Sequence, residues 1–339
     1  MSSAETIRPA KTAAHDVVLE VSELDVDIRT PRGVVRAVNQ LSFTARAGET
    51  LAILGESGCG KSMTAKAIAG LLDPVAAVTG GHVWLEGQDL EKLSAKERRK
   101  LAGPGWGMVF QDALTALNPV YTVGTQVSEA FRIHAGLSGK AAKAKAIELM
   151  RRVGIPQPES RVNAYPHQFS GGMRQRIIIA IAVALNPRLL LADEPTTALD
   201  VTVQAQIMSL LRGLREETQM AVVLITHDLA LVAEEADHVV VMYAGNVMET
   251  GPVSEVFTNP RHPYTKGLLE SVPVNSEHGA PFKSIDGTPP DLHSVPPGCV
   301  FQSRCPLVRD ICRAERPPLV EVAEGRQSAC HFWDEVQHV

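Results

Sequence analysis

The chain has 339 residues, of which 45% are hydrophobic and 21% charged, a composition that fits one large globular domain or two modest ones. A formal net charge of -5 and a pI near 6.1 leave no basic block to neutralise many phosphates, so we expect no nucleic-acid partner. The longest apolar runs, residues 177–185 and 239–244, are well short of the roughly 18 residues that suggest a membrane span.

The N-terminal region, residues 1–16, lacks the apolar core of a signal peptide, so we expect a flexible tail on a cytosolic protein. From residue 17 to about 52 the apolar residues alternate or form short β-rich pieces, such as VVLEVSELDVDI and VVRAVNQLSFTA. TPRG and RAGE turns bound these pieces. The pattern predicts a small antiparallel sheet.

A glycine-rich loop, GESGCGKS, follows a buried strand at residues 50–55 and precedes a helix reaching about residue 72. Strand, loop and helix in this order are the context of a phosphate loop, or P-loop. Its glycines let backbone N–H groups face a β-phosphate, Lys61 reaches β- and γ-oxygens, and Ser62 offers a hydroxyl to Mg²⁺. The alternative is a glycine-rich turn without a ligand. The expected nucleotide-binding residues here are Gly55, Glu56, Ser57, Gly58, Cys59, Gly60, Lys61, Ser62 and Met63.

No strand pattern appears between residues 113 and 186, and the segment GKAAKAKAIELMRRVG has a helical pattern, so we expect a helical subdomain over 113–186. Within it, HQFSGGMRQR places a serine and two glycines at a second helix start. Free backbone N–H groups and the positive end of a helix dipole favour phosphate. The sequence therefore predicts two helix starts suited to phosphate.

Three further apolar runs, residues 188–193, 221–226 and 238–245, have the length and composition of buried strands. Helical patterns separate them, for example at residues 201–218. Alternating strands and helices predict a mostly parallel sheet with covered faces. After residue 251 proline becomes frequent, which marks a loop-rich appendix.

Two acidic residues, Asp193 and Glu194, end the run LLLADEP, at the sheet edge where ligands collect in open α/β folds. Asp193 would orient the Mg²⁺ shell, and Glu194 would polarise the water that attacks the γ-phosphate. The alternative is a cap on the next helix. His227 follows another strand and could contact the γ-phosphate, or merely cap or pack. Gln111 could touch Mg²⁺ and water, or merely close a turn.

The motifs GESGCGKS, FSGGM, LLLADEP and TALD, together with Gln111 and His227, occur in the order seen in ATP-binding cassette ATPases, the nucleotide-binding subunits of ABC transporters. The segments DALTALNPVYTVGTQVSEA, YPHQFSGGMRQR and NPRHPYTKGLL resemble the oligopeptide/dipeptide and nickel permease branch. The resemblance implies a P-loop α/β fold with an antiparallel β subdomain, a mostly parallel core sheet and a helical subdomain. It places the ATPase domain at residues 17–258 and a C-terminal extension at 259–339.

The resemblance also implies roles for particular residues. The signature SGGM would close over ATP held by a second subunit packed head to tail, and Asp200 would couple the two sites. The usual leading leucine of the signature is Phe169, and the usual aromatic platform for adenine is replaced by Ile28 and Arg29. The implied catalytic residues are Glu194, His227, Gln111 and Lys61; the implied Mg²⁺ ligands are Ser62, Gln111 and Asp193; and the remaining ATP contacts are Ser170, Gly171, Gly172, Asp200 and Arg29.

Four cysteines, Cys299, Cys305, Cys312 and Cys330, crowd into the C-terminal extension. In a cytosolic protein this clustering favours a metal over disulfides, although the spacing fits neither a zinc ribbon nor a ferredoxin. Similar cysteines in peptide-permease ATPases are understood to hold a [4Fe-4S] cluster; zinc and free thiols are the alternatives. The arginines Arg304, Arg309 and Arg313 could offset the cluster's charge or form a solvated face, and Phe301, Phe332 and Trp333 could keep it dry.

The expected function is therefore an ATPase subunit of an importer of oligopeptides, dipeptides or a similar small solute. The expected partners are a second ATPase subunit, identical or related, two transmembrane permease subunits and an extracytoplasmic solute-binding protein. The expected location is the cytoplasmic face of a bacterial inner membrane. One alternative is a soluble ABC ATPase acting on DNA or ribosomes, which would need coiled-coil inserts or tandem cassettes and a basic surface. Another is an iron–sulfur redox protein that uses its P-loop for regulation.

Overall fold

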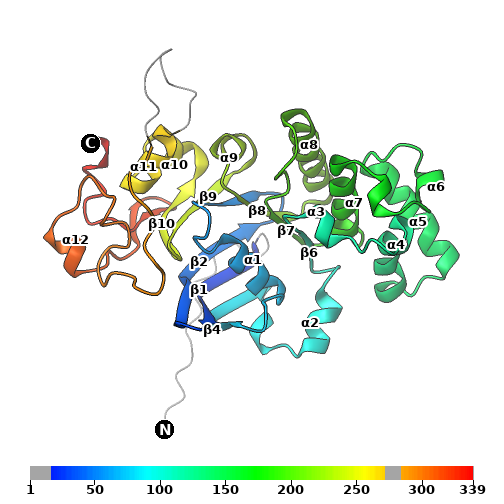
Figure 1. Ribbon diagram of the computed structural model, residues 1–339, viewed down its shortest axis with the longest axis horizontal. Coiled ribbons are helices and arrows are strands. Elements are labelled where there is room, and N and C mark those ends of the chain that lie inside the picture. The colour runs from blue at the N-terminus through cyan, green and yellow to red at the C-terminus, as the bar shows by residue number, and fades with distance from the viewer. Residues whose placement is uncertain (1–16, 272–283, 339) are drawn as a thin grey trace, which may run out of the picture.

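The computed structural model describes residues 17–271 and 284–338 (Figure 1). The expected N-terminal tail, residues 1–16, lies outside the described residues. Two sheets form the centre of the molecule. A cluster of helices lies at one end and the C-terminal extension at the other, as the two sides of Figure 1 show.

The first sheet is antiparallel and has the strand order β2-β1-β4-β5. Its strands are β1 (Val17–Thr30), β2 (Gly33–Arg46), β4 (Ala76–Leu85) and β5 (Gln88–Asp89). The predicted antiparallel sheet is confirmed, but β4 was not predicted. Its weak apolar pattern is interrupted by Gly80 and Gly81, at a bulge where Gly81 has φ of +80° and the Glu23 carbonyl lies too close for a Cβ.

The second sheet has the order β11-β12-β10-β9-β3-β8-β7-β6. The run from β9 to β6 is parallel, and the three pairs involving β10 to β12 are antiparallel. The prediction of a mostly parallel core is confirmed. The strands are β3 (Thr50–Leu54), β6 (Trp106–Val109), β7 (Leu189–Asp193), β8 (Ala221–Thr226), β9 (His238–Tyr243), β10 (Asn246–Pro252), β11 (Val320–Ala323) and β12 (Arg326–Ser328).

Helices α3 to α7 lie in the segment predicted to be helical and form the cluster at one end of the molecule (Figure 1). The apolar faces of α4, α5 and α7 share one core with α8 and with side chains of β6, β7 and β8 in the parallel sheet. The helices are α1 (Lys61–Ala69), α2 (Ala95–Leu101), α3 (Ala113–Ala116), α4 (Val123–His134), α5 (Gly139–Arg152), α6 (Pro158–Arg161), α7 (Gly171–Val183), α8 (Val201–Thr218), α9 (Leu229–Glu235), α10 (Val253–Thr258), α11 (Pro263–Glu270) and α12 (Asp310–Ala314).

The C-terminal extension is packed firmly on the core sheet. Strand β12 pairs with β10, so the hairpin β11-β12 extends the eight-stranded sheet. The Arg326 guanidinium and the Glu249 carboxylate form a buried ion pair at 2.7 Å, and the same carboxylate accepts hydrogen bonds from the backbone N–H groups of Arg261 and His262. A buried pair with these extra hydrogen bonds ties β12 and the start of α11 to β10.

His262, at the N-cap of α11, gives stability a pH dependence. Its ring is 1% exposed and its Nδ1 accepts a hydrogen bond from Tyr264 N at 3.0 Å. Burial lowers the pKa of His262 to about 3, so the folded protein keeps this ring neutral while the unfolded chain protonates it near pH 6.5. The neutral ring of His262 therefore does not oppose folding above the pKa of the unfolded chain. As pH falls from that value towards the pKa of the folded protein, the free energy of unfolding decreases.

Between pH 7 and pH 5 this residue should lower the free energy of unfolding by about 2 kcal/mol. His262→Asn keeps a capping acceptor without the titration, so its stability should fall less over the same interval. Urea unfolding at the two pH values measures the difference, with His134→Asn, at an exposed position, as control. Equal pH slopes for the wild type and His262→Asn would contradict the assignment.

Candidate active site

The P-loop connects β3 to α1 and ends in a bare helix N-terminus. Gly60, the N-cap of α1, has φ of 108°, and no side chain caps the helix. A Cβ on Gly60 would lie 2.4 Å from the carbonyl oxygen of Ala37, so a close approach to β2 also requires glycine here. The first N–H groups of α1 are therefore available to an anion.

Lys61 is buried inside the curve of this loop. Its Nζ donates hydrogen bonds to the carbonyl oxygens of Gly55 and Glu56 at 2.7 and 2.9 Å, and lies 3.9 Å from the Sγ of Cys59. The loop thus places the Lys61 ammonium beside the first backbone N–H groups of α1. Ser57 and Gly58 are exposed, so the outer side of the loop is open to solvent.

Four neighbouring parallel strands bring the remaining predicted residues to the P-loop edge of the sheet. In the order β3-β8-β7-β6, β3 leads into the P-loop and β8 into His227. Strand β7 ends at Asp193, with Glu194 next, and β6 is followed by Gln111. Because the strands are parallel neighbours, their carboxyl ends share one edge.

Asp193 and Ser62 form the candidate magnesium site. The Ser62 hydroxyl donates to Asp193 Oδ1 at 2.9 Å, and Asp193 is 4% exposed. Burial raises the pKa of Asp193, and the hydrogen bond from Ser62 works against that rise. A hydroxyl and a carboxylate oxygen at the start of the P-loop helix are ligands that suit Mg²⁺.

Glu194 lies at the centre of a second cluster. Its carboxylate accepts hydrogen bonds from Gln111 Nε2 and Thr197 Oγ1, both at 2.8 Å, and lies 3.1 Å from Nδ1 of His227. Burial would raise the pKa of Glu194, but hydrogen bonds from Thr197 and His227 outweigh it and the pKa is lowered. The ionised carboxylate can accept a proton from a water molecule.

The structure also decides between the alternatives for these residues. Helix α8 is capped by Asp200, and helix α9 by Asp228, so neither Asp193, Glu194 nor His227 serves as a helix cap. The sequence did not predict the contact of Thr197 with Glu194; Thr197 lies in the turn between the LLLADEP strand and TALD. Its spacing of three residues from Glu194 was the available signal.

The signature residues Ser170, Gly171 and Gly172 begin α7 beside the start of α8. Ser170 is the N-cap and accepts a hydrogen bond from Met173 N, and a Cβ on Gly172 would lie 2.6 Å from Val203 Cγ1. Gly172 therefore has a packing role, whereas a Cβ on Gly171 would make only an ordinary contact, 3.7 Å from Leu199 Cδ2. Across the described residues, 17–271 and 284–338, no hydrogen bond joins these three residues to the P-loop.

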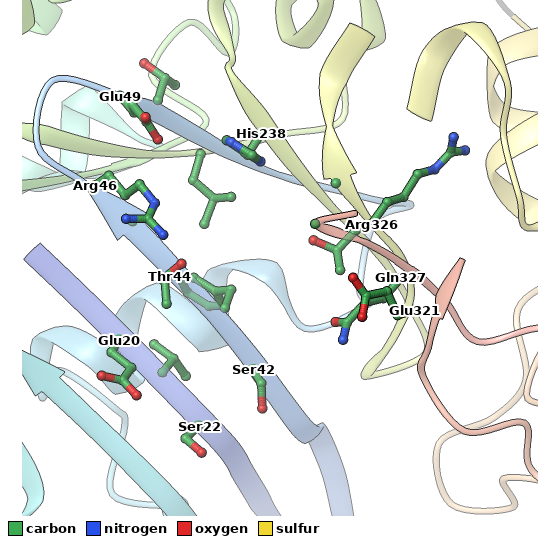
Figure 2. Close-up of a pocket in the computed structure, with 18 residues that line it drawn as sticks. Glu20, Ser22, Ser42, Thr44, Arg46, Glu49, His238, Glu321, Arg326 and Gln327 are labelled. Atoms are coloured by element: carbon green, nitrogen blue, oxygen red, sulfur yellow. The ribbon is translucent and has the colours of Figure 1, made fainter. Parts of the chain in front are cut away.

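Arg29, the proposed adenine contact, is exposed near the end of β1. Its backbone N donates to the Val75 carbonyl, and no hydrogen bond within the described ranges joins Arg29 to the P-loop. Figure 2 shows a pocket in another place, where β1 and β2 face the C-terminal hairpin. None of the expected site residues lines that pocket, whose polar walls include Glu20, Thr44 and Gln327.

The four C-terminal cysteines line one narrow pocket with Leu307 and Phe332. As placed, no three His, Cys, Asp or Glu side chains within the described part of the chain converge as they would on a metal ion. Burial raises the pKa of Cys305 to about 11 and that of Cys330 to about 12, so these thiols are protonated without a bound cation.

The arginines of this region do not form one group around the cysteines. Arg304 instead binds Glu56 of the P-loop, which corrects the expectation that it offsets a cluster's charge. Arg309 pairs with Glu335 and lies over the Phe332 ring, and Arg313 is exposed. The contact between Arg304 and Glu56 could not be read from two positions 248 residues apart.

A P-loop, a candidate magnesium site and a hydrogen-bonded glutamate at the edge of a parallel sheet are the features expected of an ATPase of the ATP-binding cassette class. Residues 38–197 match the sequence profile of the family described as ABC transporter. Among solved structures, a dimeric ATP-binding cassette bound to ADP and phosphate has a TM-score of 0.62 and 28% identity, covering 69% of this chain and 98% of that one. CbiO1 from Clostridium perfringens, part of an ABC transporter complex, has a TM-score of 0.60 and 29% identity, covering 72% and 92%.

Residues 248–312 match the family described as Oligopeptide/dipeptide transporter, C-terminal region. The chain is 49% identical to the dipeptide transport ATP-binding protein DppD of Escherichia coli K12, over 93% of this chain and 96% of the relative. It is 50% identical to DppD of Bacillus subtilis 168, over 94% and 95%. The chain therefore belongs to the oligopeptide/dipeptide family of ABC transporter ATP-binding subunits.

Proposed function

We propose that this ATPase energises the import of dipeptides, oligopeptides or a similar small solute. Relatives named as dipeptide transport ATP-binding proteins match it along almost the whole chain at about half identity, and this observation carries the proposal. The alternative, a soluble ABC ATPase outside transport, has no such relative among these matches. No helix in the described ranges has both the length and the apolar character needed to cross a bilayer.

The proposed mechanism assigns one task to each residue of the cluster. Lys61 and the N-terminus of α1 would hold the phosphates. Ser62, Asp193 and Gln111 would hold Mg²⁺, whose charge would offset that of the phosphates. Glu194 takes the proton of the attacking water. His227, whose Nδ1 lies 3.1 Å from Glu194, orients that carboxylate and contacts the γ-phosphate.

We also propose that the site is completed by a second ATPase subunit, identical or related, packed head to tail. The exposed N-terminus of α7, with Ser170 and Gly171, and the neighbouring Asp200 would close over the partner's ATP. One solved relative of similar fold is described as a dimer bound to ADP and phosphate. Two permease subunits and an extracytoplasmic solute-binding protein would complete an importer, with this chain peripheral on the cytoplasmic face of the inner membrane.

Co-purification tests the transport role. Full-length protein extracted from membranes in mild detergent should carry two transmembrane permease subunits and a second ATPase subunit. Reconstitution of that complex should show ATP hydrolysis stimulated by a solute-loaded binding protein. A chain that remains alone, with full turnover as a monomer, would contradict both the transport role and the shared site.

We propose that the chain consists of an ATPase domain at residues 17–258, with a helical subdomain at 113–186, and a C-terminal extension at 259–339. We further propose that the cysteines of this extension hold a [4Fe-4S] cluster. Four thiols lining one buried pocket are a donor set that suits iron–sulfur or zinc. The ligands would be Cys299, Cys305, Cys312 and Cys330. Bound metal would act structurally, by holding together a segment of low secondary-structure content.

Protein purified without oxygen should be brown, with an absorbance band near about 400 nm. Cys312→Ser should remove most of this colour, because the variant loses one of four ligands. Cys59→Ser is the matched control and should stay coloured, since Cys59 lies in the P-loop, outside that pocket. Colourless protein with stoichiometric zinc would show that the cysteines bind zinc and not an iron–sulfur cluster. Metal-free protein would show that the cysteines are free thiols.

A further inference from the structure

The C-terminal extension contacts the P-loop directly through one arginine. Arg304 Nη1 and Nη2 donate to the two carboxylate oxygens of Glu56 at 2.8 and 3.1 Å, a two-pronged pair. The side chain of Arg304 is 5% exposed and that of Glu56 is 26% exposed. Glu56 is the second residue of the loop GESGCGKS, so a residue from the other end of the chain pairs with the phosphate loop itself.

Arg304 is held in this position from every side. Its remaining donor capacity goes to the backbone oxygens of Ile285 and Asp286, at 3.0 and 2.9 Å, and to the Tyr243 hydroxyl at 3.3 Å. The guanidinium also lies 5.7 Å from the centre of the Tyr243 ring. Because these three hydrogen bonds fix the guanidinium independently of Glu56, it is pre-organised and loses little flexibility when it binds the carboxylate.

A second contact holds the backbone of the same loop residue. Glu56 N donates to the Tyr264 hydroxyl at 3.0 Å. The rings of Tyr243, Tyr264 and Phe301 pack on one another with centroids 4.7 to 5.3 Å apart, and all three side chains are buried. Phe301 belongs to the extension, so this aromatic cluster joins the extension to the first part of the P-loop.

We propose that Arg304 is a positioning residue for ATP binding, which acts by neutralising Glu56 and fixing it away from the phosphates. The inference rests on the proposed role of the P-loop as the ATP site. An unpaired carboxylate at the second position of the loop would repel a triphosphate in a partly buried setting, where charge interactions are weakly screened. The arginine removes that repulsion, so Lys61 remains as the one uncompensated charged side chain of the loop GESGCGKS.

The extension offers a matched arginine without this role. Arg309 pairs with Glu335 and lies over the Phe332 ring, all within the extension, and its side chain is 48% exposed. A change at Arg309 removes one positive charge from the same region without touching the P-loop. It therefore separates a specific effect of Arg304 from a general effect of charge.

Arg304→Gln should raise the dissociation constant for Mg-ATP about tenfold or more, with kcat changed by less than about threefold. The deficit relative to wild type should shrink as salt is raised from low to high concentration, because salt screens the repulsion between Glu56 and the phosphates. Titration calorimetry on the full-length chain measures affinity, and thermal unfolding checks the fold. Arg309→Gln should bind Mg-ATP as the wild type does.

The double variant Glu56→Gln/Arg304→Gln is decisive. If Arg304 acts by neutralising Glu56, affinity should return to within about threefold of wild type, since neither charge remains. Arg304→Lys, which keeps the charge but not the fork, should fall between wild type and Arg304→Gln and serves if Arg304→Gln fails to fold. Wild-type affinity in Arg304→Gln, or equal losses in the single and double variants at any salt concentration, would overturn the proposal. A wild-type chain that does not bind Mg-ATP would instead refute the proposed ATP site.

Discussion

Replacing Glu194 by glutamine should lower ATP turnover by about 100- to 1,000-fold while leaving Mg-ATP binding close to wild type. The amide keeps the size of the side chain and can still bond to Thr197 and His227, but it cannot accept a proton from water. Asp193 and Ser62, the proposed magnesium ligands, are untouched by the change. Phosphate release measured beside nucleotide affinity separates the loss of chemistry from a loss of binding.

Glu159→Gln provides the control for this substitution. Glu159 is an exposed glutamate in the helical subdomain, paired with Arg151, so its loss should leave both turnover and binding unchanged. The lowered pKa of Glu194 also predicts that this carboxylate stays ionised, and so able to act as a base, from neutral pH down to below about pH 5. Unchanged turnover in Glu194→Gln would remove the general-base assignment.

Replacing Ser170 by arginine should lower ATP turnover by about 100-fold or more, without weakening Mg-ATP affinity in the isolated monomer. The long side chain would fill the space in front of the N-terminus of α7, where the partner's ATP is proposed to sit. It would also remove the helix cap, at a cost of about 1 kcal/mol to the stability of α7. ATP-dependent dimer formation, followed by light scattering, should be lost together with turnover.

Ser138→Arg controls for the loss of the cap itself. Ser138 is also an exposed N-cap serine followed by glycine, at the start of α5 in the same subdomain. Its replacement should cost similar stability and leave turnover and dimer formation intact, because Ser138 is not among the residues proposed to close over the partner's ATP. A fall in the monomer's ATP affinity in Ser170→Arg would mean that the signature acts on ATP within its own chain.

Most of the candidate site residues were predicted from short local patterns in the sequence. The glycine spacing before Lys61 and Ser62, and the acidic pair after a buried strand, are local patterns whose geometry is set by a single strand and turn. The alternation of strands and helices along the chain also placed His227 at the carboxyl end of a strand, and the carboxyl ends of parallel strands share one edge of the sheet. The mostly parallel sheet was therefore predicted together with the residues on it.

Short strands were not predictable because their stability comes from neighbours. Strand β6, Trp106–Val109, has only four residues, one of which is Gly107, and Gly105 directly precedes it; its pairing with β7 makes it part of the sheet. That pairing is what brings Gln111 within 2.8 Å of Glu194. The hairpin β11-β12 is equally short and becomes part of the core sheet only through β10.

The amino-acid sequence by itself determined the class of chemistry, because phosphate and magnesium binding depend on residue types at fixed short spacings. The tertiary structure alone decided which side chains support them: Thr197 on Glu194, and Arg304 on Glu56. The physical reason is distance along the chain. A contact between residues separated by 248 positions leaves no periodicity in the sequence, and it exists only once the C-terminal extension has packed against the core sheet.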